Sequence, residues 1–339
     1  MALCIGMDAH HRTCTYKVKD ENGTLLDEDT IPSTREALLE LANKYPGATL
    51  VLEASSVHEW IYDLLTEAGM HVVAAHPSNM RRLMGKGRKS DALDAGFLAD
   101  MYLLGVLSTA YVPTKPIREL RQLVRRRAYL IQQRTRYTNR IHGLLKRKGV
   151  RILAEDAADE LDEVNDILAN QQRARLLRLG EPEVPVMLRL IDGVTKELQD
   201  ATFQVEKAAR DNEDVRRLMT IPGFGPLVAL AVYAEIGDVH RFPDANHVAA
   251  YFGLVPGEDQ TGESLKRGRI TKKGSPLARW LLGQAAWVHV RRCPGSSISK
   301  DFKRVSKKGK KKAIVMVARK LAKVSYHVLE EKRDFTLNG

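Results

Sequence analysis

Four acidic residues in the first hundred positions could together bind a divalent cation. Asp8 and Glu53 each directly follow a short apolar run that predicts a buried strand, and Asp91 and Asp94 lie three residues apart, on one face of a predicted helix. Carboxylates that leave adjacent strand ends can converge, and Mg²⁺ prefers such hard oxygen ligands. We therefore expect a Mg²⁺ site that polarises or positions a phosphate. Taken alone, Asp91 and Asp94 also suit a first helical turn capped by Ser90.

Two hydroxyl side chains, Thr261 and Ser264, lie in a strongly basic segment between positions 257 and 274. Its basic residues are Lys266, Arg267, Arg269, Lys272 and Lys273. A hydroxyl beside fixed cations is suited to attack a phosphodiester, because the cations stabilise charge on the nonbridging oxygens. The alternative is an ordinary solvated loop.

A turn dense in glycine and proline, residues 221–226, precedes an apolar helix. It is similar to a helix-hairpin-helix turn, in which backbone N–H groups near Gly223 and Gly225 hold a DNA phosphate. An ordinary helix–helix turn is the alternative.

The elements that must position the four acids are predicted from the spacing of apolar residues, which changes between the period of a strand and that of a helix. Strands are predicted at 3–7, 13–18, 24–29, 48–52 and 71–75, with helices from Ser33 to about Lys44 and over 60–68. Three early strands followed by alternating helix and strand predict an α/β domain with a mixed sheet, in an order that matches a ribonuclease-H-like core.

From Ile117 onward the pattern becomes helical. Between Arg118 and Arg151 the chain has twelve Lys or Arg and one acid, so this helix is expected to grip nucleic-acid backbone. The contacts we expect there are Arg118, Arg125, Arg126, Arg136 and Arg140. A second helix has a heptad seam from Met187 to Ala208, which fits either an antiparallel pair within the chain or a contact between subunits.

The composition supports a polyanionic partner. The 339 residues include 54 Lys plus Arg and 42 Asp plus Glu, a net charge of +12, and 44% are hydrophobic. These values exclude disordered and collagen-like classes, and no apolar run is long enough to span a membrane. Three scattered cysteines favour a reducing compartment, and the first residues resemble no secretory signal, so we expect a cytoplasmic protein.

Six blocks resemble those of the DEDD transposases of the IS110 type. The blocks are residues 6–8, 52–54, 89–95, 221–225, 249–256 and 268–274. The resemblance implies a RuvC-like α/β domain with the four acids (1–112), a helical coiled-coil region (113–215) and a mainly α-helical C-terminal transposase domain with a basic tail (216–339). It also implies a prokaryotic recombinase, nucleoid-associated when active, that moves an insertion sequence. Mg²⁺, donor and target DNA, a bridge RNA, a covalent serine–DNA link and a homo-oligomer, dimer or tetramer, belong to that picture.

One departure concerns the nucleophile. The family's serine usually precedes a glycine, and that register falls on Thr261 here, whereas Ser264 lies three residues further on. Three alternatives follow. Thr261 replaces the serine as nucleophile, Ser264 is the nucleophile through a local shift in register, or this copy is inactive or altered in chemistry. Register favours Thr261, but the less crowded hydroxyl of Ser264 is intrinsically more reactive. Other readings are a junction-resolving nuclease that uses metal-activated water, or a catalytically silent nucleic-acid-binding relative.

Overall fold

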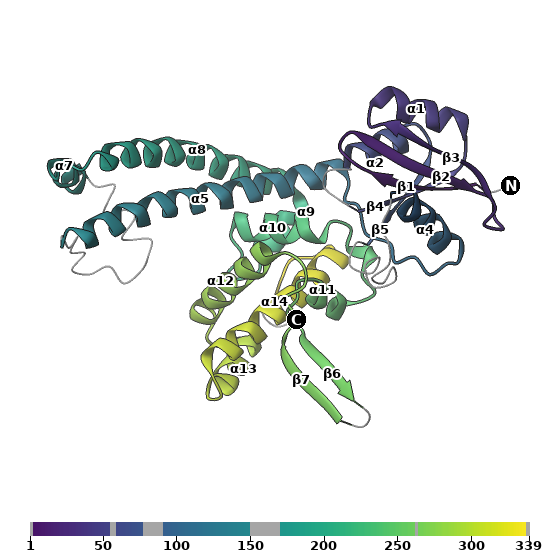
Figure 1. Ribbon diagram of the computed structural model, residues 1–339. Coiled ribbons are helices and arrows are strands. Elements are labelled where there is room, and N and C mark those ends of the chain that lie inside the picture. Colours follow the sequence, from purple (N-terminus) through teal and green to yellow (C-terminus); the bar gives the residue numbers. More distant parts are fainter. Residues whose placement is uncertain (1–2, 55–58, 77–90, 150–169, 262–263, 337–339) are drawn as a thin grey trace. The chain divides into compact units, whose positions relative to one another are not determined.

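The computed structural model describes residues 3–54, 59–76, 91–149, 170–261 and 264–336 and consists of two compact units, Met1–Val112 and Pro113–Gly339 (Figure 1). The first boundary coincides with the expected end of the α/β domain. Separate middle and C-terminal domains, divided near residue 215, stay a prediction. None of the described helices combines the length and the hydropathy needed to cross a membrane.

The first unit is a mixed five-stranded sheet covered by helices. Its elements are β1 (Cys4–Ala9), β2 (Thr13–Lys19), β3 (Leu25–Pro32), α1 (Arg35–Lys44), β4 (Thr49–Glu53), α2 (Glu59–Glu67), β5 (His71–Ala75) and α4 (Asp91–Leu103). The strand order is β3-β2-β1-β4-β5, antiparallel from β3 to β1 and parallel from β1 to β5. The predicted α/β class with a mixed sheet is confirmed. The cap of α1 differs from the prediction, because Thr34 rather than Ser33 accepts the backbone N–H of Ala37.

Strand alternation separates two cores in this unit. One face of the sheet contributes residues such as Ile5, Met7 and Leu52, which pack against α1 and α2. The other face contributes Cys4 and Val51, which pack against Leu98 and Ala99 of α4. Since side chains alternate along a strand, every second residue of β1 and β4 therefore faces α4.

The second unit is mainly helical. Its elements are α5 (Lys115–Arg147), α7 (Asn170–Arg178), α8 (Glu183–Asp211), α9 (Glu213–Met219), α10 (Pro226–Ile236), η2 (Val239–Arg241), α11 (Ala245–Tyr251), β6 (Pro256–Thr261), β7 (Ser264–Ile270), α12 (Pro276–Arg292), α13 (Ser297–Ser306) and α14 (Lys310–Glu330). One large core joins α9 to α14, and residues of α5 and α8 extend it. The strands β6 and β7 pair as an antiparallel hairpin that projects from this helical body (Figure 1).

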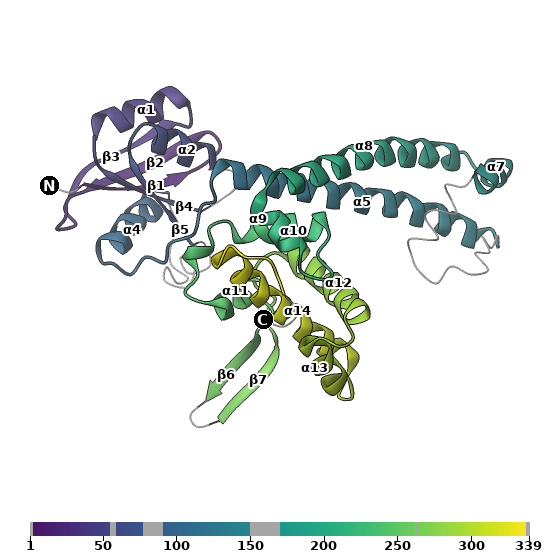
Figure 2. The same ribbon diagram turned by 180° about the vertical axis from the view of Figure 1, so that it is seen from behind.

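The helices α5 and α8 lie side by side in both views (Figures 1 and 2) and run antiparallel. Arg140 pairs with Glu183, at the start of α8, whereas Arg126 pairs with Glu197, further along it. The heptad seam of α8 therefore packs within the chain, which is the intramolecular alternative.

The middle of this pair is polar. The Arg127 Nε donates to the Thr202 hydroxyl over 3.0 Å. Arg134 follows Arg127 by seven residues and Thr195 precedes Thr202 by seven, so the antiparallel pairing places them at corresponding positions of the two helices. The Nε of Arg134 and the hydroxyl of Thr195 are both buried without a hydrogen-bond partner. Burial and the nearby charge of Arg134 lower the pKa of Arg127. Two half-buried like charges thus lie between the apolar layers of this pair.

Candidate active site

Asp8 and Glu53 lie side by side at the carboxyl ends of two parallel strands. The register pairs Met7 of β1 with Leu52 of β4, so the next residue of each strand is an acid, and the predicted adjacency of these strands is confirmed. Met7 and Leu52 belong to the core on the α1 and α2 face, whereas Val51 packs toward α4. Asp8 and Glu53 therefore share the α4 face of the sheet.

Helix α4 approaches this face closely because β1 contains a glycine. A Cβ at Gly6 would fall 1.9 Å from the carbonyl oxygen of Ala95 and 2.8 Å from the backbone nitrogen of Ala99. No residue with a side chain fits there without moving the helix. The contact fixes Asp94, which precedes Ala95, over the sheet face that carries Asp8.

The oxygen atoms on this face fit a hard cation. One carboxylate oxygen of Asp94, Oδ1, is buried and has no hydrogen-bond partner, a costly state that a bound cation would relieve. Asp8 is 18% exposed, and its Oδ2 lies 3.3 Å from Nε2 of His10. Among the described residues no three potential ligands already form a group, and the side chain of Asp91 lies outside that part of the structure. Asp8, Glu53 and Asp94 are thus the described residues that would hold a divalent metal.

The two candidate nucleophiles lie opposite each other in the β6–β7 hairpin. Thr261 pairs with Ser264 in the strand register, and the two residues between them lie outside the described residues. The prediction that this segment is a loop was wrong, because its charged residues hide the strand period that pairing reveals. Whether the hairpin is catalytic or only solvated stays a prediction. The structure describes the backbone but not the side chains of Thr261, Ser264, Lys266 and Arg267.

The base of this hairpin is held by backbone contacts. The N–H of Thr271 donates to the Val255 carbonyl over 2.9 Å, and the N–H of Lys272 donates to the Gly253 carbonyl over 3.2 Å. Lys272 has a φ of 54°, a left-handed conformation that is strained for a side chain and typical of functional segments. Lys272, Lys273 and Arg269 are exposed, as a phosphate-binding role requires.

The 221–226 turn uses its two glycines differently. A Cβ at Gly223, where φ is 101°, would lie 2.4 Å from the carbonyl oxygen of Ala285, so this glycine permits close packing against α12. Gly225 is the N-cap of α10 and has open space around its Cα, which leaves the helix start accessible to an anion. Of the two predicted contacts, Gly225 is the one whose surroundings suit a phosphate.

Most of the predicted basic contacts on α5 interact within the chain. Arg118 is 8% exposed and donates to the Pro113 carbonyl over 2.6 Å, so its side chain does not face a ligand. The ion pairs of the others are Arg125 with Glu235, Arg126 with Glu197 and Asp200, and Arg140 with Glu183. Arg136 is exposed and has no ion pair within the described chain. Acids of α8 and α10, distant in sequence, thus balance part of the charge counted on α5.

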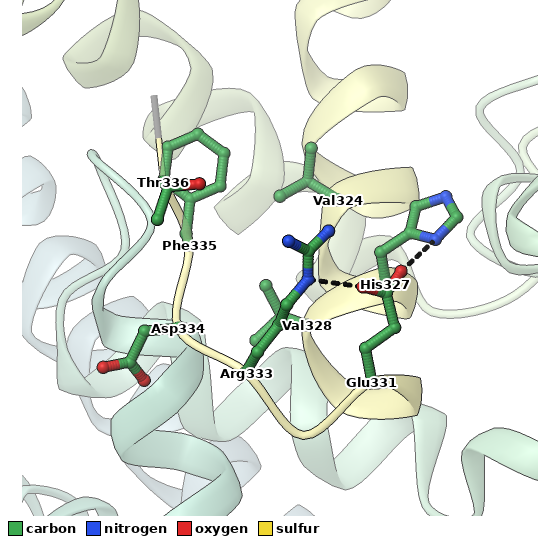
Figure 3. A pocket seen from close by; sticks show the side chains of 8 residues that line it. All are labelled: Val324, His327, Val328, Glu331, Arg333, Asp334, Phe335 and Thr336. Atoms are coloured by element: carbon green, nitrogen blue, oxygen red, sulfur yellow. Dashed lines mark ion pairs between the residues drawn. The ribbon is translucent and has the colours of Figure 1, made fainter. Parts of the chain in front are cut away.

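A cavity of about 350 Å³ near the C-terminal end of α14 is lined by none of the predicted site residues (Figure 3). It is lined by Val324, His327, Glu331 and Arg333, among others, and Glu331 pairs with both His327 and Arg333. With its cations already paired to this acid, the cavity offers no open anion site.

Sequence comparison decides the family. Residues 215–304 match the family model described as "Transposase IS116/IS110/IS902 family", and residues 5–149 match the DEDD model of the IS110 type, described as "Transposase". A putative transposase of Sinorhizobium fredii, y4rJ, is 30% identical over 304 residues, which cover 82% of this chain and 76% of the relative. The chain belongs to the IS110-type DEDD transposases. These are enzymes that cut and rejoin DNA.

Two further relatives of this transposase chain add detail. The transposase for insertion sequence element IS1111A of Coxiella burnetii is 26% identical over 85% of this chain and 79% of its own length. A pilin gene-inverting protein of Moraxella bovis is 36% identical over 128 residues, 37% of this chain and 39% of its own. Transposition and gene inversion therefore both occur among relatives of the chain.

Sequence reasoning missed one buried residue of the transposase that links two segments of the second unit. His289 is fully buried, donates from Nδ1 to the Pro222 carbonyl over 2.9 Å, and contacts the Ser296 hydroxyl through Nε2 over 3.1 Å. It therefore connects the 221–226 turn to the N-cap of α13. A lone histidine inside an apolar helix gives no sequence signal for this role.

Proposed function

We propose that the chain is a site-specific DNA recombinase that moves an insertion sequence and is guided by a bridge RNA. Its first unit is a RuvC-like, ribonuclease-H-like domain, and the strand order β3-β2-β1-β4-β5 with a helix on each face supports this reading. The α5–α8 pair of the second unit is the coiled-coil region of this recombinase. Base pairing with the guide supplies target choice, as in other RNA-guided effectors.

The observation that carries the proposal is the shared face of Asp8, Glu53 and Asp94, with its unpartnered carboxylate oxygen. With Asp91, these acids would hold Mg²⁺, which polarises the oxygens of a scissile phosphate when bound. The acids position the phosphate, and Arg267, Arg269 and Lys272 stabilise the charge that develops on it.

The reaction we assign is a transesterification. The hydroxyl oxygen of Thr261 or Ser264 attacks phosphorus, the hydroxyl proton passes to solvent, and the bond from phosphorus to the departing strand breaks. The departing strand oxygen takes up a proton, and the protein keeps the other strand as a phosphodiester. Attack by that strand oxygen, or by one of another DNA end, reverses the step and rejoins DNA.

Trapping the covalent intermediate tests this function. The full chain is incubated with Mg²⁺, its guide RNA and a suicide DNA substrate, and a protein–DNA adduct is sought on a denaturing gel. We expect an adduct in the wild type and none in Asp8→Asn. An adduct lost in Thr261→Ala but kept in Ser264→Ala assigns the nucleophile to Thr261, and the reverse pattern assigns it to Ser264.

The same gel separates the alternatives. Cleavage without an adduct points to a junction-resolving nuclease, in which metal-activated water attacks. Neither cleavage nor adduct, together with retained DNA binding, points to a catalytically silent relative. Cleavage that persists undiminished in Asp8→Asn and Asp91→Asn contradicts the metal site.

Assembly completes the proposal. A dimer or tetramer allows acids of one subunit and a hydroxyl of another to form one site. The active enzyme is cytoplasmic and associates with the nucleoid. Light scattering with and without RNA measures this, and a monomer under both conditions would exclude the composite site.

A further inference from the structure

The end of α13, the following turn and the start of α14 form a dense patch of positive charge, which we call the α13–α14 basic surface. Residues 300–312 contain eight basic side chains and one acid, Asp301. The basic residues are Lys300, Lys303, Arg304, Lys307, Lys308, Lys310, Lys311 and Lys312, and all are exposed. The two helices pack against each other (Figure 2), so the surface is a fixed feature of the second unit.

Almost none of this charge is balanced within the described chain. Arg304 pairs with Asp301 over 2.5 Å, and Lys320 of α14 pairs with the same acid. The seven lysines of the surface have no ion pair in that part of the structure. This differs from α5, where Arg125, Arg126 and Arg140 are all paired with acids of neighbouring helices.

Three lysines lie where the helix dipole disfavours positive charge. Lys310, Lys311 and Lys312 form the first turn of α14, which contains no acid, and its N-cap Gly309 offers no side-chain hydrogen bond. The positive end of the helix dipole repels cations at this position. Charges placed against the dipole, exposed and unpaired, are explained by an anion that comes from outside the chain.

The surface lacks the aromatic groups that bind unpaired bases. Phe302, the aromatic residue of α13, is half-buried and packs edge-to-face on Trp287 with ring centroids 5.8 Å apart. Single-strand binding uses exposed aromatic side chains as stacking platforms, whereas lysines bind phosphate without reading sequence. We propose that the α13–α14 basic surface binds the phosphate backbone of a double-stranded nucleic acid independently of its sequence. None of its residues is among the four acids or in the β6–β7 hairpin.

Binding by the full chain, measured by fluorescence anisotropy, tests the proposal without requiring catalysis. The probes are a duplex DNA, a duplex RNA and a single-stranded DNA of one arbitrary sequence. The variant combines Lys310→Ala, Lys311→Ala and Lys312→Ala. The control combines Arg189→Ala, Lys196→Ala and Lys207→Ala, which removes three exposed charges from α8.

We expect the α14 variant to bind duplex at least about tenfold more weakly at 0.1 M salt, and the control less than about twofold more weakly. The slope of log affinity against log salt should fall by about 2.7 for three lost phosphate contacts, at about 0.9 per contact. A loss of affinity for only one of the two duplexes still supports the proposal, and it identifies the bound nucleic acid as DNA or as RNA.

Thermal unfolding separates binding from a structural role. The α14 variant should unfold at the wild-type temperature or above it, because the helix dipole no longer opposes three charges. Equal losses in variant and control, a loss confined to single strands, or unchanged affinity would each overturn the proposal. These outcomes do not depend on adduct formation, so a failure here leaves the recombinase proposal intact.

Discussion

The backbone of Gly6 on β1 lies against the carbonyl of Ala95 on α4, at a distance that leaves no room for a methyl group. This contact brings the helix that carries Asp94 onto the strand that carries Asp8. The geometry of the carboxylate face thus depends on a residue that has no side chain.

Replacing Gly6 with Ala should disrupt that face. A Cβ 1.9 Å from the Ala95 oxygen has to displace α4, which we expect to lower the free energy of unfolding by about 1–3 kcal/mol and strand cleavage by about 100-fold. Gly96→Ala is the matched control on α4, since its Cβ would meet only the flexible Lys17 side chain at 3.3 Å. Chemical denaturation measures the stability of both variants, and a cleavage assay measures their activity. Equal effects of the two variants would contradict the prediction.

Mg²⁺ should stabilise the wild type through Asp94. A cation that binds only the folded state adds about 2.7 kcal/mol at a hundred times its dissociation constant, so the unfolding temperature should rise with Mg²⁺. Asp94→Asn should lose this rise. Asp100→Asn removes an acid from the same helix that pairs with Lys19, and it should keep the rise. A Mg²⁺ shift that survives in Asp94→Asn argues against this ligand.

Stability in acid should depend on Asp27. Its carboxylate accepts hydrogen bonds from Lys44, Tyr45 and Tyr16, and chiefly the Lys44 contact lowers its pKa to about 2. A carboxyl whose folded-state pKa is depressed stabilises the fold above the unfolded pKa of about 3.9 and loses that contribution as pH falls toward 2.

Asp27→Asn should therefore destabilise the protein at pH 6, and most of that deficit should disappear only as the pH approaches 2. Urea unfolding of both proteins across this range measures the difference. Asp29→Asn changes an exposed acid of the same strand, is the control and should change little. A deficit that stays constant with pH would show that Asp27 acts by packing alone.

His289 should be required for the stability of the second unit. In His289→Ala the Pro222 carbonyl loses its donor, the Ser296 hydroxyl loses a partner, and a cavity remains in a fully buried site. We expect a loss of about 2–4 kcal/mol. His327→Ala removes a 54% exposed histidine that pairs with Glu331 and should cost less than about 0.5 kcal/mol. Denaturant midpoints compare the two variants. Similar losses of stability would contradict a structural role for the buried contacts of His289.

The polar middle of the α5–α8 pair should be a site of easy stabilisation. Arg134→Leu removes a charge near Arg127 and an unpartnered buried nitrogen, so we expect a gain of about 1 kcal/mol. Arg136→Leu changes an exposed residue of the same helix and should give no gain. A loss of stability in Arg134→Leu would mean that the arginine has a partner that compensates its charge.

The sequence by itself determined the elements of the first unit and the position of its acids. Apolar alternation over five to eight residues is a local signal, so the strands that precede Asp8 and Glu53 are visible in it. The motif blocks identify the family for the same reason, because each block is contiguous.

Only the tertiary structure decided which basic side chains remain available to bind a ligand. Arg118 and Arg126 look alike in the sequence, yet one is buried against Pro113 and the other is paired with Glu197 of α8. Lys310 is exposed and forms no ion pair with a described residue. Strand pairing likewise revealed the β6–β7 hairpin, whose residues show little alternation. Charge balance and pairing depend on groups far apart in the chain, and only folding brings those groups together.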